Sequence, residues 1–252
     1  MLNKIIIEKM NYIKLICIIC VAFVSVEGFA QGQITRPNKK EQNSSSQKNQ
    51  IKPSHNNKQE DAEAQYLRGL NYQYGFDVNQ NDAEAVKWFR KAAEQGHAEA
   101  QSALGLAYES GRGINKNYNE AVKWYRKAAA QGDADGQRRL GSCYYYGRGV
   151  DKDYDEAVKW FRKAVMQGDA FAQYKMGECY AMGRGVNRND YEAVKWYKKS
   201  AEQGFVAAQS LLGEAYERGR GITKNYYEAL KWYRKAAEQG DEYAIKKLQE
   251  MQ

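Results

Sequence analysis

The chain has 252 residues, of which 28% are charged and 43% hydrophobic, and its mean hydropathy of −0.83 is typical of a soluble body. Only 2 prolines and 22 glycines accompany abundant Ala, Lys, Glu, Tyr and Trp, which favours helices over strands. The net charge of +8 divides into +5 for residues 1–60 and +3 for residues 61–252, so most of the excess lies outside the repeated part of the chain. The composition therefore argues against a nucleic-acid-binding body.

Residues 1–30 have the pattern of a secretory signal peptide, because lysines precede an apolar run of 12 residues, 15–26. This run is shorter than the roughly 20 residues that cross a bilayer. A small residue at position −3 and Ala30 at −1 predict cleavage before Gln31, and a start at Met10 would leave the signal intact. The alternatives are an uncleaved anchor and a buried helix. We expect an exported protein, periplasmic or secreted, without a stable membrane span after cleavage.

Residues 31–60 are rich in Gln, Asn, Ser and Lys and poor in apolar side chains. Such a segment buries too little surface to offset the entropy lost on ordering. We predict a disordered polar linker that tethers the remainder of the chain.

A period of 36 residues governs the rest of the sequence. The five tryptophans follow it: Trp88, Trp124, Trp160, Trp196 and Trp232. Three series of glycines keep the same period, which defines five repeats over 61–96, 97–132, 133–168, 169–204 and 205–240, with 241–252 left over. A strict internal period of this length indicates a solenoid of stacked units. A tryptophan kept in every unit is expected to be part of the scaffold rather than of a carbohydrate platform.

The second repeat illustrates the expected unit. Apolar spacing predicts a first helix from about Ala98 to Ser110, ended by glycines that can take the left-handed conformation of a C-cap. A second helix is expected from about Asn119 to Ala130, with candidate N-caps in the preceding turn. Gly105 lies in the middle of the first helix, and its recurrence in each repeat indicates a close approach of two helices.

The pattern AxAQ…LG…Y…GRGV…YxEAxKWYRKAAxQG resembles the Sel1-like repeat family, relatives of the tetratricopeptide repeats, and covers residues 61–240. The resemblance implies a right-handed superhelix whose first helices line an inner surface. The expected fold is therefore all-α: a right-handed α/α solenoid of five 36-residue helix-turn-helix repeats with a C-terminal capping helix in 241–252. The first repeat departs from the pattern, since Phe76-Asp77 stands where later repeats have Arg-Gly.

No convergent set of catalytic groups is apparent, and we predict no catalytic residue, metal site or cofactor. His97 occupies a slot filled by aspartates in other repeats and is expected to cap a helix. The GRG triplets are expected to be capping turns rather than phosphate cradles. Some cysteine-rich members of the family carry paired cysteines and have been associated with β-lactams. Here Cys143 and Cys179 stand at equal positions of adjacent repeats, and we predict two buried, unpaired thiols.

Function is expected where the repeats differ, at outward positions of the first helices. These positions are apolar or aromatic toward the N-terminal end and charged toward the C-terminal end, and the alternative is drift at solvent-exposed sites. The residues predicted to bind a partner are Leu70, Tyr74, Leu106, Arg139, Tyr146, Lys175, Glu178, Met182, Glu214 and Arg218.

These patterns favour a non-catalytic, exported protein–protein interaction scaffold that binds a protein or peptide on the concave surface of the solenoid. Two other classes stay open: a hydrolase of β-lactam or cell-wall compounds, and a peptidoglycan-binding module. The sequence does not identify the partner.

Overall fold

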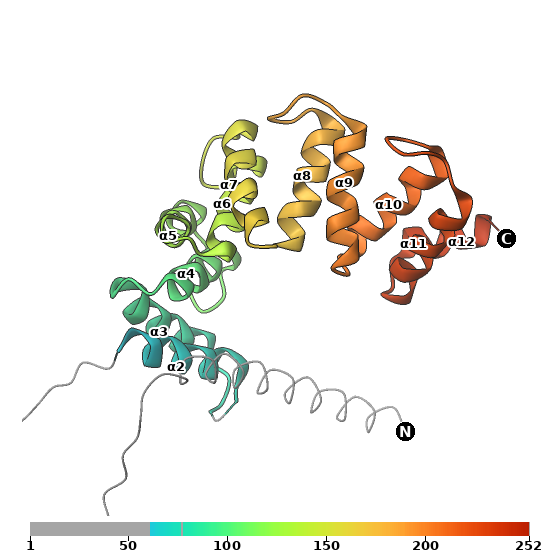
Figure 1. The fold of residues 1–252 in the computed structure, drawn as a ribbon. Helices are drawn as coiled ribbons and strands as arrows, with labels where there is room; N and C mark the ends of the chain where they lie inside the picture. Colours follow the sequence, from blue (N-terminus) through green and yellow to red (C-terminus); the bar gives the residue numbers. More distant parts are fainter. Residues whose placement is uncertain (1–60, 77, 252) are drawn as a thin grey trace, which may run out of the picture. The chain divides into compact units, whose positions relative to one another are not determined.

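The computed structural model describes residues 61–76 and 78–251, and within them every regular element is a helix (Figure 1). The predicted signal peptide and linker lie outside the described residues. The first helices of the repeats are α2 (Ala62–Tyr74), α4 (Ala98–Ser110), α6 (Ala134–Tyr146), α8 (Ala170–Met182) and α10 (Val206–Arg218). The second helices are α3 (Asp82–Glu94), α5 (Tyr118–Ala130), α7 (Tyr154–Met166), α9 (Asp190–Glu202) and α11 (Tyr226–Glu238), and α12 (Glu242–Glu250) follows them.

Side-chain caps fix where the helices begin. The Asn117 side chain accepts a hydrogen bond from the backbone N of Glu120 at 3.1 Å, so α5 starts at Tyr118, one residue before the predicted start. At α4 the cap is His97, whose Nδ1 accepts from the backbone N of Ala100 at 3.3 Å. The predicted bounds of α4 and the capping role of His97 are confirmed.

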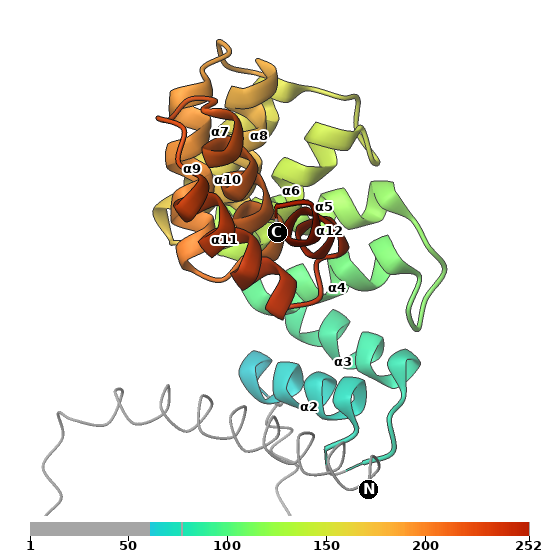
Figure 2. The ribbon, with the colours of Figure 1, turned by 90° about the vertical axis from the view of Figure 1, so that its right-hand side faces the viewer.

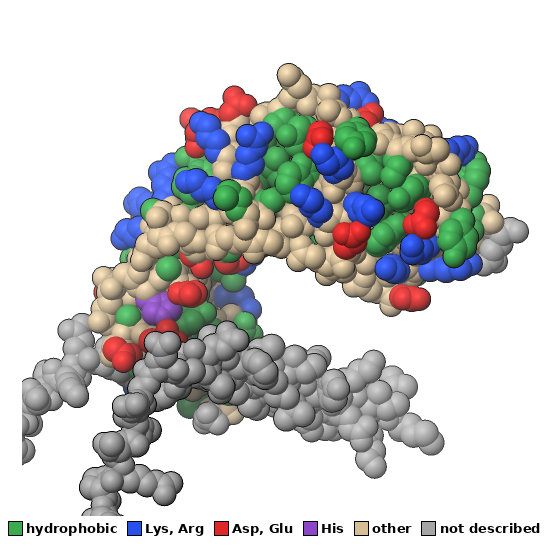
Figure 3. Space-filling view, in the orientation of Figure 1, with side chains coloured by type: hydrophobic (Ala, Val, Ile, Leu, Met, Phe, Trp, Pro, Cys, Tyr) green, Lys and Arg blue, Asp and Glu red, His purple; other side chains and the backbone are tan. Residues whose placement is uncertain are grey.

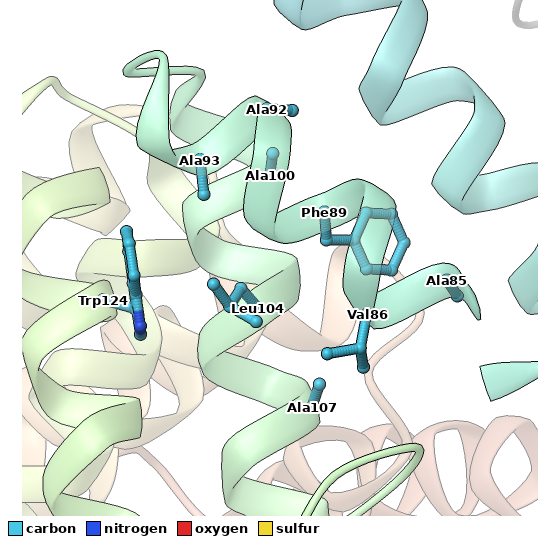
Figure 4. Packing of buried hydrophobic residues seen from close by; sticks show 9 residues of the cluster. All are labelled: Ala85, Val86, Phe89, Ala92, Ala93, Ala100, Leu104, Ala107 and Trp124. Carbon is cyan, nitrogen blue, oxygen red and sulfur yellow. The ribbon is translucent and has the colours of Figure 1, made fainter. Parts of the chain in front are cut away.

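Each helix contacts the helices before and after it in the chain, and Figures 1 and 2 show them stacked in a helical solenoid. The core is continuous from one repeat to the next. Figure 4 shows Leu104 of α4 between Phe89 and Val86 of α3 on one side and Trp124 of α5 on the other. At the C-terminal end, Ala244 and Leu248 of α12 and Met251 after it join the cluster around Tyr233, as expected of a capping helix.

Glycines permit the closest contacts within and between repeats. A Cβ on Gly105 would lie 2.5 Å from Cε1 of the buried Tyr125, which confirms the predicted close approach of the two helices. The two glycines of the GRG triplet have different structural roles. Gly111 is the left-handed C-cap of α4, as expected, whereas a Cβ on Gly113 would lie 2.2 Å from the backbone O of Asp82 in the preceding repeat. The second glycine is therefore an inter-repeat contact, a role that the sequence did not reveal.

Buried glutamines also join the repeats, and the sequence reasoning missed them. Gln101 accepts from Nε2 of Gln131 at 2.8 Å and donates to the backbone O of Ala93 in the preceding repeat at 3.1 Å. The amide–amide pair recurs in every repeat, between residues 65 and 95, 101 and 131, 137 and 167, 173 and 203, and 209 and 239. The signal was the Gln of the AxAQ motif, because a polar side chain kept among alanines needs a buried partner.

Candidate partner-binding groove

The ten predicted binding residues all lie on first helices, but in different surroundings. Tyr74, Tyr146, Met182 and Arg218 are exposed as expected. Leu70 packs against the hydrophobic cluster of the first two repeats. Lys175 contradicts the expectation of an outward position, since only 4% of its surface is exposed. It points into the space between α6 and α8 rather than toward solvent.

The spaces between successive first helices explain these differences. We call each of them a junction and describe it by three positions: one near the C-terminal end of the earlier helix and two in the first half of the later helix. The three positions recur every 36 residues, so that the five junctions can be compared directly. They are 73/99/103, 109/135/139, 145/171/175, 181/207/211 and 217/243/247.

In the α4–α6 junction the third position is Arg139. Its Nε donates to Asp135 at 2.6 Å, and its Nη1 lies 3.5 Å from Glu109. The guanidinium also lies 5.9 Å from the centre of the Tyr125 ring. The side chain thus fills this junction with a charged, hydrogen-bonded network and is no free binding residue.

In the α6–α8 junction the third position is Lys175, surrounded by aromatic rings. Its Nζ donates to Tyr146 Oη at 2.6 Å and to Glu178 at 2.5 Å. The ammonium lies 4.9–5.4 Å from the centres of the rings of Tyr145, Tyr146, Phe171 and Tyr174. Burial by itself lowers the pKa of Lys175, but the hydrogen bonds to Glu178 and Tyr146 and the charge of Glu178 outweigh it, so the pKa is raised.

The α10–α12 junction is occupied in the same manner. Nζ of Lys247 lies 3.2 Å from Glu217 and 5.9 Å from the centre of the Tyr243 ring. The hydrogen bond to Glu217 raises the pKa of Lys247. Three of the five junctions therefore hold an inserted cation beside a carboxylate and an aromatic ring. We call Arg139, Lys175 and Lys247 the junction cations.

The α8–α10 junction carries small or uncharged side chains at the three positions, Ala181, Ala207 and Leu211, and these leave a groove of about 480 Å³. We call it the α8–α10 groove. Ala193, Val194 and Tyr197 of α9 also line it. Figure 3 shows hydrophobic side chains interspersed with charged ones over the part of the solenoid formed by α8 to α12.

Four of the predicted binding residues line this groove: Glu178, Met182, Glu214 and Arg218. Arg218 forms a 3.0 Å ion pair with Glu214, and 53% of the Met182 surface is exposed. Arg220 donates to Asp190 at 3.1 Å, and this hydrogen bond lowers the pKa of Asp190. Burial, together with the charge of Glu178, raises the pKa of Tyr174 to about 12. The groove therefore combines apolar lining with acidic and basic groups.

A smaller groove of about 50 Å³ lies at the α2–α4 junction and includes the predicted residue Leu106, together with Val86 and Phe89 of α3. The structure thus brings Glu178, Met182, Glu214 and Arg218 together and places Leu106 elsewhere. It also joins Tyr146 to Lys175, which the sequence did not predict. The sequence missed Ala181, Ala207 and Leu211 because their meaning comes only from comparison with the occupied junctions.

The cysteines and tryptophans are packed as scaffold. Cys143 and Cys179 are buried and unpaired, as predicted, and burial raises the pKa of each thiol to about 12. Trp124 and Trp232 are buried, and the others are partly buried. A lysine three residues later lies over each tryptophan ring, 3.9–4.6 Å from its centre: Lys91, Lys127, Lys163, Lys199 and Lys235.

Within residues 61–76 and 78–251, no three His, Cys, Asp or Glu side chains are grouped so as to hold a metal ion. In the same part of the chain, no helix combines the length and apolar character needed to cross a membrane.

The family model of the Sel1 repeat matches residues 62–97, 98–133, 134–169, 170–205 and 206–241, one residue later than the repeat bounds drawn from the sequence. The chain belongs to the Sel1 repeat family. Proteins of this family are generally protein-interaction scaffolds, and they are typically non-catalytic. No curated protein matches the chain.

Solved structures agree with this assignment. A Sel1 repeat protein from Oxalobacter formigenes is 42% identical, with a TM-score of 0.71 over 75% of each chain. The protein c5321, a protective antigen of uropathogenic Escherichia coli with an SLR fold, is 40% identical with a TM-score of 0.69. That match covers 74% of this chain but only 40% of c5321. A Sel1 repeat protein from Klebsiella pneumoniae, 22% identical with a TM-score of 0.50, shares the fold.

Proposed function

We propose that this Sel1-repeat protein is a non-catalytic scaffold that holds a segment of a partner protein in the α8–α10 groove. The observation that carries the proposal is the contrast between junctions. At the positions filled by Tyr145, Phe171 and Lys175 in the neighbouring junction, the groove has two alanines and a leucine, and a volume of about 480 Å³ stays open. Apolar lining with a charged rim is typical of sites that bind protein segments.

The comparison between junctions supplies a variant that closes the groove. The triple substitution Ala181→Tyr, Ala207→Phe and Leu211→Lys installs the residues that the chain itself uses one repeat earlier. A matched control introduces the same residue types at exposed positions, as Ala130→Tyr, Met166→Phe and Gln80→Lys. Circular dichroism checks that both variants keep their helical content.

The test is crosslinked capture from the producing bacterium, with the tagged full chain as bait and mass spectrometry as readout. The proposal expects a protein that is captured by the native chain and the control variant and lost with the closed-groove variant. Capture that survives closure of the groove would place the binding surface elsewhere. A folded native chain that captures no protein would overturn the scaffold proposal and return attention to β-lactam and peptidoglycan assays.

We also propose that the scaffold works outside the cytoplasm, in the periplasm or beyond the cell. Support comes from residues 1–30, with their lysines, 12-residue apolar run and small residues before Gln31. Cell fractionation followed by N-terminal sequencing tests this. A protein in the periplasm or medium that begins at Gln31 is the expected result, and an intact N-terminus in the cytoplasm would contradict it.

A further inference from the structure

The occupied junctions show which chemistry fits between first helices of this solenoid. Each holds one cationic side chain: Arg139, Lys175 or Lys247. Each of these cations lies within 3.5 Å of a carboxylate, and each lies within 6 Å of the centre of a tyrosine ring. Such a site provides both charge-assisted hydrogen bonding and cation–π attraction, and the aliphatic part of Lys or Arg fills the apolar space.

The α8–α10 groove offers the same kinds of groups without a cation of its own at the third position. Tyr174 and Tyr197 provide rings, and Glu178 and Glu214 provide carboxylates at equal positions of the two facing helices. Leu211 stands where the other junctions have the junction cation. Lys175 belongs to the neighbouring junction, and its Nζ reaches Glu178 of the groove from there.

The charges of the groove also favour a cationic side chain like those of the junction cations. Its lining contains two guanidinium groups, those of Arg218 and Arg220. It contains four carboxylates: Glu178, Asp190, Glu214 and Asp241. Both guanidiniums already lie within 3.1 Å of a carboxylate of the groove. Lys175 of the neighbouring junction pairs with Glu178 at 2.5 Å. With Lys175 counted, the carboxylates of the lining exceed the cations by one, beside an apolar surface.

We propose that the α8–α10 groove receives a lysine or arginine side chain of the partner segment, in the place that the junction cations take elsewhere. The inference rests on the proposed scaffold function and names the chemistry that the scaffold recognises. The aliphatic part of the guest side chain lies along Val194 and Leu211, and its cationic end lies between Glu178 and Glu214. Neighbouring apolar residues of the partner contact Met182.

Two other occupants carry similar chemistry and are distinguished by the test. Residues 31–60 of the same chain hold six basic and two acidic side chains, and a covalently attached segment competes at high effective concentration. A second copy of the chain also presents exposed lysines. Either occupant would compete with a foreign peptide for the groove.

The experiment selects binders from a random dodecapeptide phage library on the immobilised full chain. Peptides enriched on the native chain and not on the closed-groove variant are synthesised in three forms: as selected, with the basic residue acetylated or replaced by citrulline, and with it replaced by Glu. Fluorescence anisotropy at two salt concentrations gives their affinities. We expect the selected peptides to share a Lys or Arg. Neutralising that residue should reduce the affinity about tenfold or more, and this reduction should be smaller at high salt.

Glu214→Gln is the matching change in the protein, and it should reduce the preference for the basic peptide over its neutral form. Groove-specific peptides that lack a basic residue, or that bind equally after neutralisation, would overturn the inference and leave the scaffold function standing. Peptides that bind only after the six basic residues of 31–60 are replaced by Gln would assign the groove to the chain's own segment. Light scattering that shows a dimer lost on closure of the groove would assign it to a second copy. Both of these outcomes also overturn the inference.

Discussion

At the scale of single residues, a charge can be part of the packing of this solenoid. Lys175 is almost fully buried, and its ammonium contacts a carboxylate, a hydroxyl and several aromatic rings. Removing one partner of a buried ion pair costs more than the pair itself contributes, because the remaining charge stays desolvated. Lys175 therefore matters for stability through Glu178 and Tyr146 as much as through its own charge.

Lys175→Met tests this role. We expect the unfolding free energy to fall by about 3–4 kcal/mol, in the lower part of the range for buried pairs because Glu178 keeps some contact with water. Urea unfolding at neutral pH measures the loss, and the double variant with Glu178→Gln should recover part of it. Lys163→Met, on an exposed face beside Trp160, is the control and should change little. Equal losses for the two lysines would contradict the packing role.

The two buried thiols give a stability effect that depends on pH. Burial raises the pKa of Cys143 and of Cys179 from 9.0 to about 12, so the folded chain keeps both protons to a higher pH than the unfolded chain does. The contribution of the two thiols to the unfolding free energy is nearly constant below pH 9. From pH 9 toward 12 it becomes unfavourable to folding, because the thiols ionise in the unfolded chain while they stay protonated in the folded chain.

The double variant Cys143→Ala and Cys179→Ala isolates this effect, since alanine is the residue that the second and fifth repeats carry at the same position. Between pH 8 and pH 10.5 the native chain should lose about 2 kcal/mol more per thiol than the variant does. Buried tyrosines titrate in both proteins, so their effect cancels in the difference. Urea unfolding of both proteins at the two pH values measures this difference. Equal losses of unfolding free energy in the native chain and the variant would mean that the thiols already ionise in the folded state.

At the scale of the helix pair, close packing overrides helix propensity. Gly105 lies inside α4, where glycine is about 1 kcal/mol worse than alanine. A methyl group there would lie 2.5 Å from the ring of Tyr125, which is fully buried and whose hydroxyl donates to Glu109 at 2.6 Å. The ring has little freedom to move away, so the glycine is required by the partner helix.

Gly105→Ala should therefore destabilise the fold by about 1–2 kcal/mol, because the cost of overpacking exceeds the gain in helix propensity. Thermal and urea unfolding measure the change. Glu94→Ala, at an exposed position of the neighbouring helix α3, is the control and should leave stability nearly unchanged. A stabilised Gly105→Ala protein would show that the two helices can separate without loss.

The helices were predictable because their signals are local, whereas the groove was not. Capping residues and glycines set the bounds of α4 from the sequence alone. Ala181, Ala207 and Leu211 belong to two helices of different repeats, and each is ordinary within its own helix. Only the pairing of α8 with α10 makes them the lining of a groove. Lys175 was misjudged for the same reason, since its partner Tyr146 lies one repeat earlier.

At the scale of the whole solenoid, the first and last described helices depart from the repeat pattern at positions where the described residues provide no further repeat as a neighbour. Arg68 and Asn71 stand where the second repeat has the buried Leu104 and Ala107. In α12, Ile245 stands at the position of the buried glutamines, and no second helix follows it within the described residues to provide an amide partner. Each position thus follows its contacts with the adjacent repeat, as expected for a fold held together by nearest neighbours.

Removal of residues 241–252 tests this nearest-neighbour description. The truncation deletes Asp241, which accepts from Ser210 at 2.8 Å, and Lys247, which pairs with Glu217, and it uncovers Tyr233. We expect faster amide hydrogen exchange in α10 and α11, with little change in α3 and α4, because the lost contacts reach only the last repeat.

Lys246→Ala, at an exposed position of α12, is the control and should leave the exchange pattern unchanged. The alternative is a single cooperative unit, in which the truncation would speed exchange equally in every helix. That result would mean that the glutamine and glycine contacts between repeats transmit the loss along the solenoid. A graded loss that fades toward α3 would instead leave the α2–α4 groove intact while it weakens the α8–α10 groove, whose lining includes Asp241.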